Sequence, residues 1–203
     1  MEVRILNDIY SDENTYFIID KEKAIVIDPG STFEKTEEFA KDIEIEYIFL
    51  THCHYDHIRC VNEIREKYNA KVCCTLEAAE NIKNPDISLT MMGLGKRLSI
   101  ENAEIILDEE TDFDFYGNKI KTIKTPGHTS CSTVFLLGEN LFSGDTIFYQ
   151  NVGRWDLPTG NGETLIKSIK EKIYTLPDNT RIYPGHGRST SVDYEKKYNM
   201  YVR

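Results

Sequence analysis

All five histidines of this 203-residue chain lie in three short segments. Residues 51–57 read THCHYDH, residues 125–129 read TPGHT, and residues 183–187 read YPGHG. Imidazole is the commonest metal ligand among protein side chains. A chain that places every histidine in turn-like motifs, and none on the face of a helix, is expected to build one metal centre. A metal-dependent enzyme is therefore the first hypothesis.

Strand-like runs alternate with helical patterns along the chain, which predicts an α/β layer arrangement. In the first half we expect strands at 15–20, 24–28, 47–50 and 71–74, a helix capped by Ser31 that ends near Asp42, and helices at 58–68 and 76–82. In the second half we expect strands at 119–124, 133–137, 141–142 and 181–183, and a helix at 163–176. Every suspected histidine or aspartate then follows a strand, where α/β enzymes commonly assemble their sites.

The composition fits a single globular domain over residues 1–203, because the chain shows no linker, repeat or low-complexity stretch. The net charge of −10 argues against nucleic acid or an anionic membrane as a partner, since both require a basic surface. No apolar run approaches the roughly 18 residues that span a bilayer. Acidic residues stand where a signal peptide would be apolar. We expect a cytoplasmic protein with a small-molecule substrate, and its oligomeric state is not readable.

The five cysteines form no CxxC pair, which is typical of reduced thiols rather than a disulfide framework. Cys53 and Cys131 each neighbour a candidate ligand, so each could act as a thiolate ligand. The commoner role of such a cysteine is that of a small buried hydrophobe.

The spacing of HxHxDH predicts two binding points at one shared site. His52 and His54 are two residues apart, so in extended backbone their side chains face the same way. Asp56 and His57 come at the turn into the next helix and can point to an adjacent position. Zinc accepts such nitrogen and oxygen donors in near-tetrahedral geometry, and catalytic sites keep one position for water. Manganese or iron would also accept histidine with carboxylate, so the metal stays open.

Four motifs, in order, resemble the metal motifs of the metallo-β-lactamase superfamily, and most closely those of the glyoxalase II-like hydrolases. They are HxHxDH at 52–57, PGH at 126–128, GD at 144–145 and PGHG at 184–187. The resemblance covers essentially the whole chain and implies an αββα four-layer sandwich of the metallo-β-lactamase type. It also implies two divalent metal ions, with zinc as the expected metal and iron or manganese as the alternatives. The implied ligands are His52, His54 and His128 for the first ion, Asp56, His57 and His186 for the second, and Asp145 as a bridge.

The resemblance implies hydrolysis of a small thioester or ester, such as a hydroxyacyl-glutathione, with Asp56 and Asp145 as catalytic carboxylates. Two cations that share a water lower its pKa from about 15.7 toward 7, which supplies hydroxide at neutral pH. A cation would also polarise the carbonyl oxygen. A leaving thiolate, whose conjugate acid has a pKa of about 8.5, needs no separate general acid. No histidine is left over to serve as one.

The chain also departs from the family pattern. Ile58, Arg59 and Cys60 follow HxHxDH where Ile-Gly-Gly is common, and the roles of Arg59 and Cys60 stay open. The chain is expected to be a short form without the C-terminal helical domain of full-length glyoxalase II. Arg154 is expected to contact substrate, whereas Arg188 stands where the family usually has an aromatic residue, which argues against glutathione as the thiol carrier. Segment 84–99 could be a flexible cover over the site or a plain surface loop.

Two other functions stay open. A persulfide dioxygenase, a mononuclear iron enzyme of the same superfamily, is favoured by Cys53 within the motif and opposed by PGHG at 184–187. A non-catalytic metal-binding protein on the same fold is opposed by the retention of all seven ligand positions. The sequence poorly separates lactonase from β-lactamase activity. The negative net charge argues against a nuclease. His54 argues against a flavodiiron protein. The metal prediction requires His128, Asp145 and His186 to lie beside segment 51–57.

Overall fold

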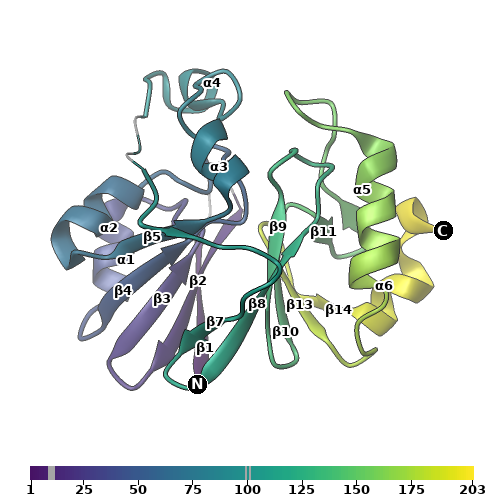
Figure 1. The fold of residues 1–203 in the computed structure, drawn as a ribbon, viewed down its shortest axis with the longest axis horizontal. Coiled ribbons are helices and arrows are strands. Elements are labelled where there is room, and N and C mark those ends of the chain that lie inside the picture. Colours follow the sequence, from purple (N-terminus) through teal and green to yellow (C-terminus); the bar gives the residue numbers. More distant parts are fainter. Residues whose placement is uncertain (9–11, 99, 101) are drawn as a thin grey trace. The chain divides into compact units, whose positions relative to one another are not determined.

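The computed structural model describes residues 1–8, 12–98, 100 and 102–203, which fall into two units, Met1–Ile106 and Leu107–Arg203. Each unit contains a six-stranded mixed sheet with its own helices (Figure 1). The order of strands and helices confirms the predicted α/β class. The expectation of a single domain stays a prediction. Among the described residues, no helix has the length and apolar character that crossing a membrane requires.

The first unit is built on a sheet with its strands in chain order. The strands are β1 (Glu2–Asp8), β2 (Glu13–Asp20), β3 (Lys23–Ile27), β4 (Glu44–Phe49), β5 (Lys71–Cys74) and β6 (Ile105–Ile106). Strands β1 to β3 pair antiparallel, and β3 to β6 run parallel. The sequence did not predict β1, whose charged and largely exposed side chains hide its alternation.

The helices of the first unit are short. They are α1 (Phe33–Phe39), α2 (Val61–Tyr68), α3 (Leu76–Asn81) and α4 (Thr90–Leu94). A threonine side chain caps the N-terminus of α1 and of α3 but not of α2 or α4. The predicted cap of α1 is wrong by one residue, because the Thr32 side chain accepts from the Lys35 N–H and the Ser31 hydroxyl bonds to Asp8 instead. The helix also ends at Phe39, before the predicted Asp42, which has a left-handed φ of 66°. Phe39 packs against Phe17 of β2 with ring centroids 5.0 Å apart.

Segment 84–98 contains α4 between two residues in left-handed conformation, Leu89 and Gly95. Whether the segment covers the site stays a prediction. Ser99, the last residue of the segment 84–99 considered above as a cover or a surface loop, lies outside the described residues.

The second unit has a sheet of order β14-β13-β10-β9-β8-β7 and a separate hairpin. The strands are β7 (Phe113–Phe115), β8 (Asn118–Lys124), β9 (Thr133–Leu137), β10 (Asn140–Gly144), β13 (Arg181–Pro184) and β14 (Thr190–Ser191), and the hairpin is β11 (Ile147–Phe148) with β12 (Asn151–Val152). Strands β7 to β10 pair antiparallel, and β10 pairs in parallel with β13.

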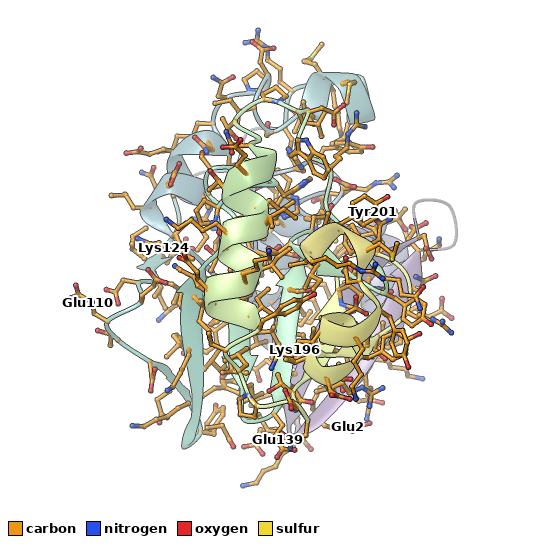
Figure 2. All side chains as sticks on the ribbon, turned by 90° about the vertical axis from the view of Figure 1, so that its right-hand side faces the viewer. Glu2, Glu110, Lys124, Glu139, Lys196 and Tyr201 are labelled. Atoms are coloured by element: carbon orange, nitrogen blue, oxygen red, sulfur yellow. The ribbon has the colours of Figure 1, made fainter. Side chains whose placement is uncertain are left out.

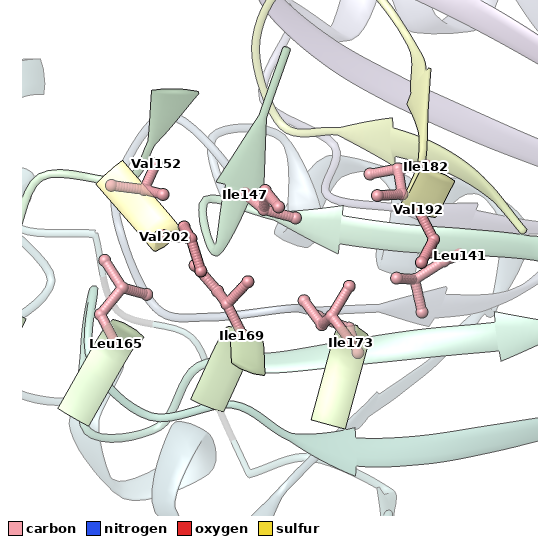
Figure 3. Close-up of a cluster of buried hydrophobic side chains, with 10 residues drawn as sticks. Leu141, Ile147, Val152, Leu165, Ile169, Ile173, Ile182, Val192 and Val202 are labelled. Carbon is pink, nitrogen blue, oxygen red and sulfur yellow. The ribbon is translucent and has the colours of Figure 1, made fainter. Parts of the chain in front are cut away.

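The helices of the second unit cover an aliphatic core. Helix α5 (Gly162–Ser168) continues into a π-helical turn, Ile169–Ile173, so the predicted helix 163–176 ends a few residues early. Leu165, Ile169 and Ile173 pack in one buried cluster with strand residues that include Leu141 and Ile182 (Figure 3). Helix α6 (Val192–Tyr198) and a 3-10 turn, Met200–Val202, were not predicted. Figure 2 shows α5 in green and α6 in yellow side by side.

Candidate metal centre

Asp28 and segment 51–57 leave the first sheet at the same edge. Strands β3 and β4 pair in parallel, Asp28 directly follows β3, and Thr51 comes shortly after β4. Parallel neighbours present their carboxyl ends together, which is where α/β proteins commonly place ligand sites. The backbone N–H of Thr51 donates to Asp28 Oδ1 over 2.8 Å. The carboxylate of Asp28 therefore fixes the start of the histidine motif.

The same buried carboxylate determines the tautomers of two histidines. The Thr51 hydroxyl lies 2.5 Å from Asp28 Oδ2 and 3.0 Å from His52 Nδ1. Because a carboxylate only accepts, Thr51 donates its one proton to Asp28 and accepts from the Nδ1–H of His52. The Nδ1–H of His57 donates to the same Asp28 oxygen over 3.0 Å. In a neutral ring protonated at Nδ1, Nε2 is the nitrogen that can ligate a metal, so both rings have the tautomer that ligation requires.

The imidazoles of His52, His54 and His57 form one buried cluster. The His52 ring centroid lies 4.8 Å from that of His54 and 4.2 Å from that of His57. All three side chains belong to the buried polar residues of the chain. Asp28, His52 and His57 also present ligand-type atoms within 4.8 Å of one another. Protonated imidazoles this close and this buried would repel one another, so the cluster suits neutral rings around a cation.

Gly30 of the DPG sequence permits the close approach of segment 51–57. A Cβ atom at Gly30 would lie 1.5 Å from the carbonyl oxygen of Asp56 and 2.6 Å from Cδ of Glu13. Any side chain at this position would collide with the backbone of the metal motif. The sequence Asp-Pro-Gly at 28–30 is typical of a turn, and here it also positions Asp56.

Glu13 is a fully buried carboxyl group behind this cluster. Burial raises its pKa well above the usual range, and Asp28 and Asp56 raise it further, while His57 and Thr15 oppose the shift. The Thr15 hydroxyl lies 3.1 Å from one Glu13 oxygen and 3.0 Å from the Asp28 carbonyl oxygen, which only accepts. A protonated Glu13 can donate to Thr15 while Thr15 donates to Asp28. Burial therefore favours the protonated, neutral form of Glu13.

The Glu13→Gln variant tests this protonation state. In the wild type, native Glu13 retains a proton that the unfolded chain releases above a pKa of about 4.3. Stability should therefore fall as the pH rises, by at most about 1.4 kcal/mol per pH unit. Glutamine carries no such proton, so urea unfolding should show the variant gaining stability relative to the wild type between pH 5 and pH 7.5. A constant difference over that range would show that Glu13 is ionised in the native state.

The three remaining candidate ligands gather at one edge of the second sheet. His128 follows β8, Asp145 follows β10, and His186 follows β13. Strands β8 and β10 both pair antiparallel with β9, and β10 pairs in parallel with β13, so these three strands share one direction. Their carboxyl ends therefore meet at the same edge. This confirms the expectation that each suspected residue follows a strand.

Asp145 faces both histidines of this unit. Its Oδ2 lies 3.6 Å from His128 Nε2 and 3.7 Å from His186 Nε2. These distances exceed those of direct hydrogen bonds. Two ligands of a tetrahedral zinc ion, each about 2.1 Å from the metal, would lie about 3.4 Å apart. The spacing matches ligands that share a cation better than it matches hydrogen-bonded pairs.

The backbone of Gly153 and Arg154 supports His128. The Nδ1–H of His128 donates to the Arg154 carbonyl oxygen over 2.7 Å, so this ring too has the tautomer that ligates through Nε2. A Cβ atom at Gly153 would lie 1.8 Å from the carbonyl oxygen of Asp145 and 3.2 Å from Cγ of His128. The glycine therefore permits the approach of this backbone to both candidate ligands.

The side chain of Arg154 is 61% exposed and forms a two-fold hydrogen-bonded ion pair with Asp156, each contact 2.7 Å long. This pair lowers the pKa of Asp156 to about 2. Contact between Arg154 and substrate stays a prediction, and the backbone role of this residue was not predicted. The guanidinium of Arg188 lies 3.5 Å from the centroid of the Tyr149 ring.

All five cysteines are buried thiols. No candidate ligand group among the described residues includes Cys53 or Cys131. Cys60 contacts the Pro29 carbonyl oxygen and the Thr36 hydroxyl, and burial raises its pKa to about 12. A thiol with so high a pKa is a poor nucleophile and a poor ligand at neutral pH.

Asp28, Thr51 and Glu13 were not predicted as residues of the site. Asp28 and Thr51 adjoin features that the sequence does show, a DPG turn after a strand and the residue before the first motif histidine. Such neighbours commonly orient metal-ligating histidines. Glu13 carries no comparable signal, because its burial depends on strand pairing.

The Asp28→Asn variant should weaken zinc binding about 10- to 100-fold, as loss of a residue that orients ligands usually does. An amide cannot accept from the Thr51 N–H, the Thr51 hydroxyl and the His57 ring together. Competition with a chromophoric chelator measures the affinity. Asp20→Asn, at the end of β2, is the matched control and should bind zinc as the wild type does. Unchanged affinity in Asp28→Asn would contradict the orienting role.

Comparison with known proteins identifies the family. Residues 11–186 match the model of the metallo-β-lactamase superfamily, and the chain belongs to that superfamily. A probable metallo-hydrolase of Streptococcus pyogenes serotype M6 is 36% identical over 199 residues, which cover 93% of this chain and 85% of the relative. The hydroxyacylglutathione hydrolase GloC of Haemophilus influenzae is 28% identical and covers 100% of this chain and 98% of its own length.

Solved structures agree with this assignment. The crystal structure of the BLEG-1 B3 metallo-β-lactamase has a TM-score of 0.92 at 26% identity, over 99% of both chains. The protein TTHA1623, in a di-iron-bound form, has a TM-score of 0.80 at 29% identity, over 93% of this chain and 94% of that chain. The predicted fold class is thereby confirmed as the metallo-β-lactamase fold. Each unit supplies one mixed sheet with its helices, as an αββα sandwich requires. The chain thus carries a histidine/aspartate metal site of a metallo-hydrolase superfamily.

Proposed function

We propose that this protein is a hydrolase of a small thioester or ester that uses two divalent cations, with zinc as the expected metal. The observation that carries the proposal is the donor arrangement in each unit. His52, His57 and His128 are each held through Nδ1 in the Nε2-ligating tautomer. Asp145 presents an oxygen at ligand spacing to His128 and His186. This donor set fits zinc and also fits iron or manganese.

The residues assigned to the cations follow the family pattern. His52, His54 and His128 would hold one ion, Asp56, His57 and His186 the other, and Asp145 both. Cations bound there would lower the pKa of a coordinated water and so supply a nucleophile at neutral pH. The chain's own contribution is to orient the imidazoles and to keep them neutral within a buried cluster. Arg154 would move from Asp156 to an anionic part of the substrate.

The thioester specificity is supported by the relative GloC, which is a hydroxyacylglutathione hydrolase. We infer a small-molecule substrate as the partner, and we infer that neither nucleic acid nor a membrane is one, because the net charge is −10. The five free cysteines fit a reducing compartment such as the cytoplasm.

A mononuclear iron persulfide dioxygenase is the second candidate. The di-iron form of TTHA1623 shows that a protein of similar structure holds iron, although it holds two ions and not one. Cys53 lies between His52 and His54, but its side chain is fully buried.

One experiment separates these functions. Elemental analysis of purified protein is coupled to a panel of thioesters and esters and to an oxygen electrode. The proposal predicts two divalent ions per chain, hydrolysis that chelation abolishes, and recovery on addition of zinc. One iron per chain with oxygen uptake would establish the dioxygenase instead. Full metal occupancy without turnover of any substrate would indicate a metal-binding protein without catalysis.

A further inference from the structure

A pocket of about 400 Å³ opens beside Asp56 within the first unit. Its walls come from the histidine motif, the starts of α1 and α2, and the region of α4. The lining residues that matter here are Tyr55, Asp56, Arg59, Glu63, Glu34 and Lys96. The volume falls within the range of small-molecule sites. Apart from Asp56, no residue of this lining has a role in the function proposed above.

The wall formed by α4 is fixed to the histidine motif through Tyr55. The Tyr55 N–H donates to the Ser88 carbonyl oxygen over 2.9 Å. Gly93 of α4 lies against the Tyr55 ring, since a Cβ atom there would come within 2.3 Å of its carbons. The ring thus sets the distance between α4 and the motif, and with it the width of the pocket. The pocket is therefore a preformed feature of this unit.

Charges of both signs surround the pocket. Arg59 and Lys96 are exposed cations, and within the described parts of the chain neither forms a hydrogen bond or a side-chain ion pair. Glu34 and Glu63 are exposed carboxylates on the same lining. A ligand with charge of one sign would be attracted by one pair and repelled by the other. A ligand that carries both signs can satisfy both pairs.

We propose that this pocket binds a zwitterionic group of the amino-acid type, with Arg59 and Lys96 receiving its carboxylate and Glu34 and Glu63 its ammonium. The position beside Asp56 places that group next to the bond to be cleaved, so the pocket selects substrates that bear an α-amino acid. The identity of the substrate rests on the proposed hydrolase function, whereas the binding does not. Arg59 becomes a residue that determines specificity.

Binding of four stable thioethers to the metal-loaded protein tests the proposal without any hydrolysis. The probes are S-methyl-L-cysteine, which is zwitterionic, S-methylcysteamine, a cation, 3-(methylthio)propionate, an anion, and S-methyl-N-acetylcysteamine, which is neutral. Chemical-shift titration of 15N-labelled protein gives each dissociation constant and locates the binding site. We expect the zwitterion to bind about 10-fold more tightly than any other probe, with shifts at the amides of residues 55–63 and 93–96.

Variants assign the contacts. Arg59→Gln and Lys96→Gln should each weaken binding of S-methyl-L-cysteine about 5- to 10-fold and leave the neutral probe unaffected. Arg97→Gln, an exposed cation next to Lys96 that does not line the pocket, is the matched control and should change nothing. Equal binding of the zwitterion and the anion, or unchanged binding in Arg59→Gln, would overturn the proposal. If the zwitterion binds here but no thioester is hydrolysed, the site stands and the hydrolase function fails.

Discussion

Replacement of Asp145 with alanine is expected to reduce kcat/KM for thioester hydrolysis by about 10³-fold or more. Asp145 Oδ2 faces both His128 Nε2 and His186 Nε2 at ligand spacing, so its loss removes the negative charge at the point where both cations would be held. Groups that hold a metal-bound nucleophile in place and supply negative charge to the metals lower the activation barrier by several kcal/mol. Metal content should fall from two ions per chain to about one or fewer, as measured by elemental analysis.

Two further variants make the Asp145 result specific. Asp145→Asn keeps the shape of the side chain and should lose nearly as much activity, because the charge is what the cations require. Asp112→Ala removes an exposed carboxylate in the same unit and should leave activity and metal content unchanged. Circular dichroism should report native secondary structure in all three proteins. Full thioesterase activity in Asp145→Ala would remove the basis of the two-metal assignment.

Replacement of Gly30 with alanine is expected to destabilise the first unit by about 3 kcal/mol or more and to disrupt metal binding. The added Cβ atom would lie 1.5 Å from the Asp56 carbonyl oxygen, which is a backbone atom and cannot rotate away. Overpacking of a buried contact costs about 1–3 kcal/mol, and more when only backbone can yield. Displacement of Asp56 would also move the neighbouring His57. Urea unfolding and zinc titration measure the two effects.

The matched control for this variant is Gly138→Ala, in the turn between β9 and β10. A Cβ atom at Gly138 would meet open space, although its φ of 57° makes alanine unfavourable by about 1–2 kcal/mol. Gly138→Ala should therefore lose some stability but keep its metal and its activity. If Gly30→Ala behaved as Gly138→Ala does, the close contact between the DPG turn and Asp56 would not constrain the site.

Most strands were predicted to within a few residues, because apolar runs and turn residues are local signals. The strands before the histidine motifs are present, and each candidate ligand follows one of them. The errors arise where contacts between distant residues decide the local structure. Ser31 and Thr32 are both good N-caps, and the contact of Ser31 with Asp8, distant in sequence, decides between them. Helix α6 was not predicted. Its residue Val192 packs in the buried cluster of the second unit, a contact that the local sequence does not show.

By itself, the sequence determined the donor types, their spacing and their places after strands. It therefore also determined the superfamily and the metal chemistry available to it. Only the tertiary structure decided that Asp28 holds His52 and His57 in their ligating tautomers, and that the Arg154 backbone does so for His128. Pairing of strands brings such partners together from distant parts of the chain. The direction of a hydrogen bond depends on that proximity, which no local pattern of residues encodes.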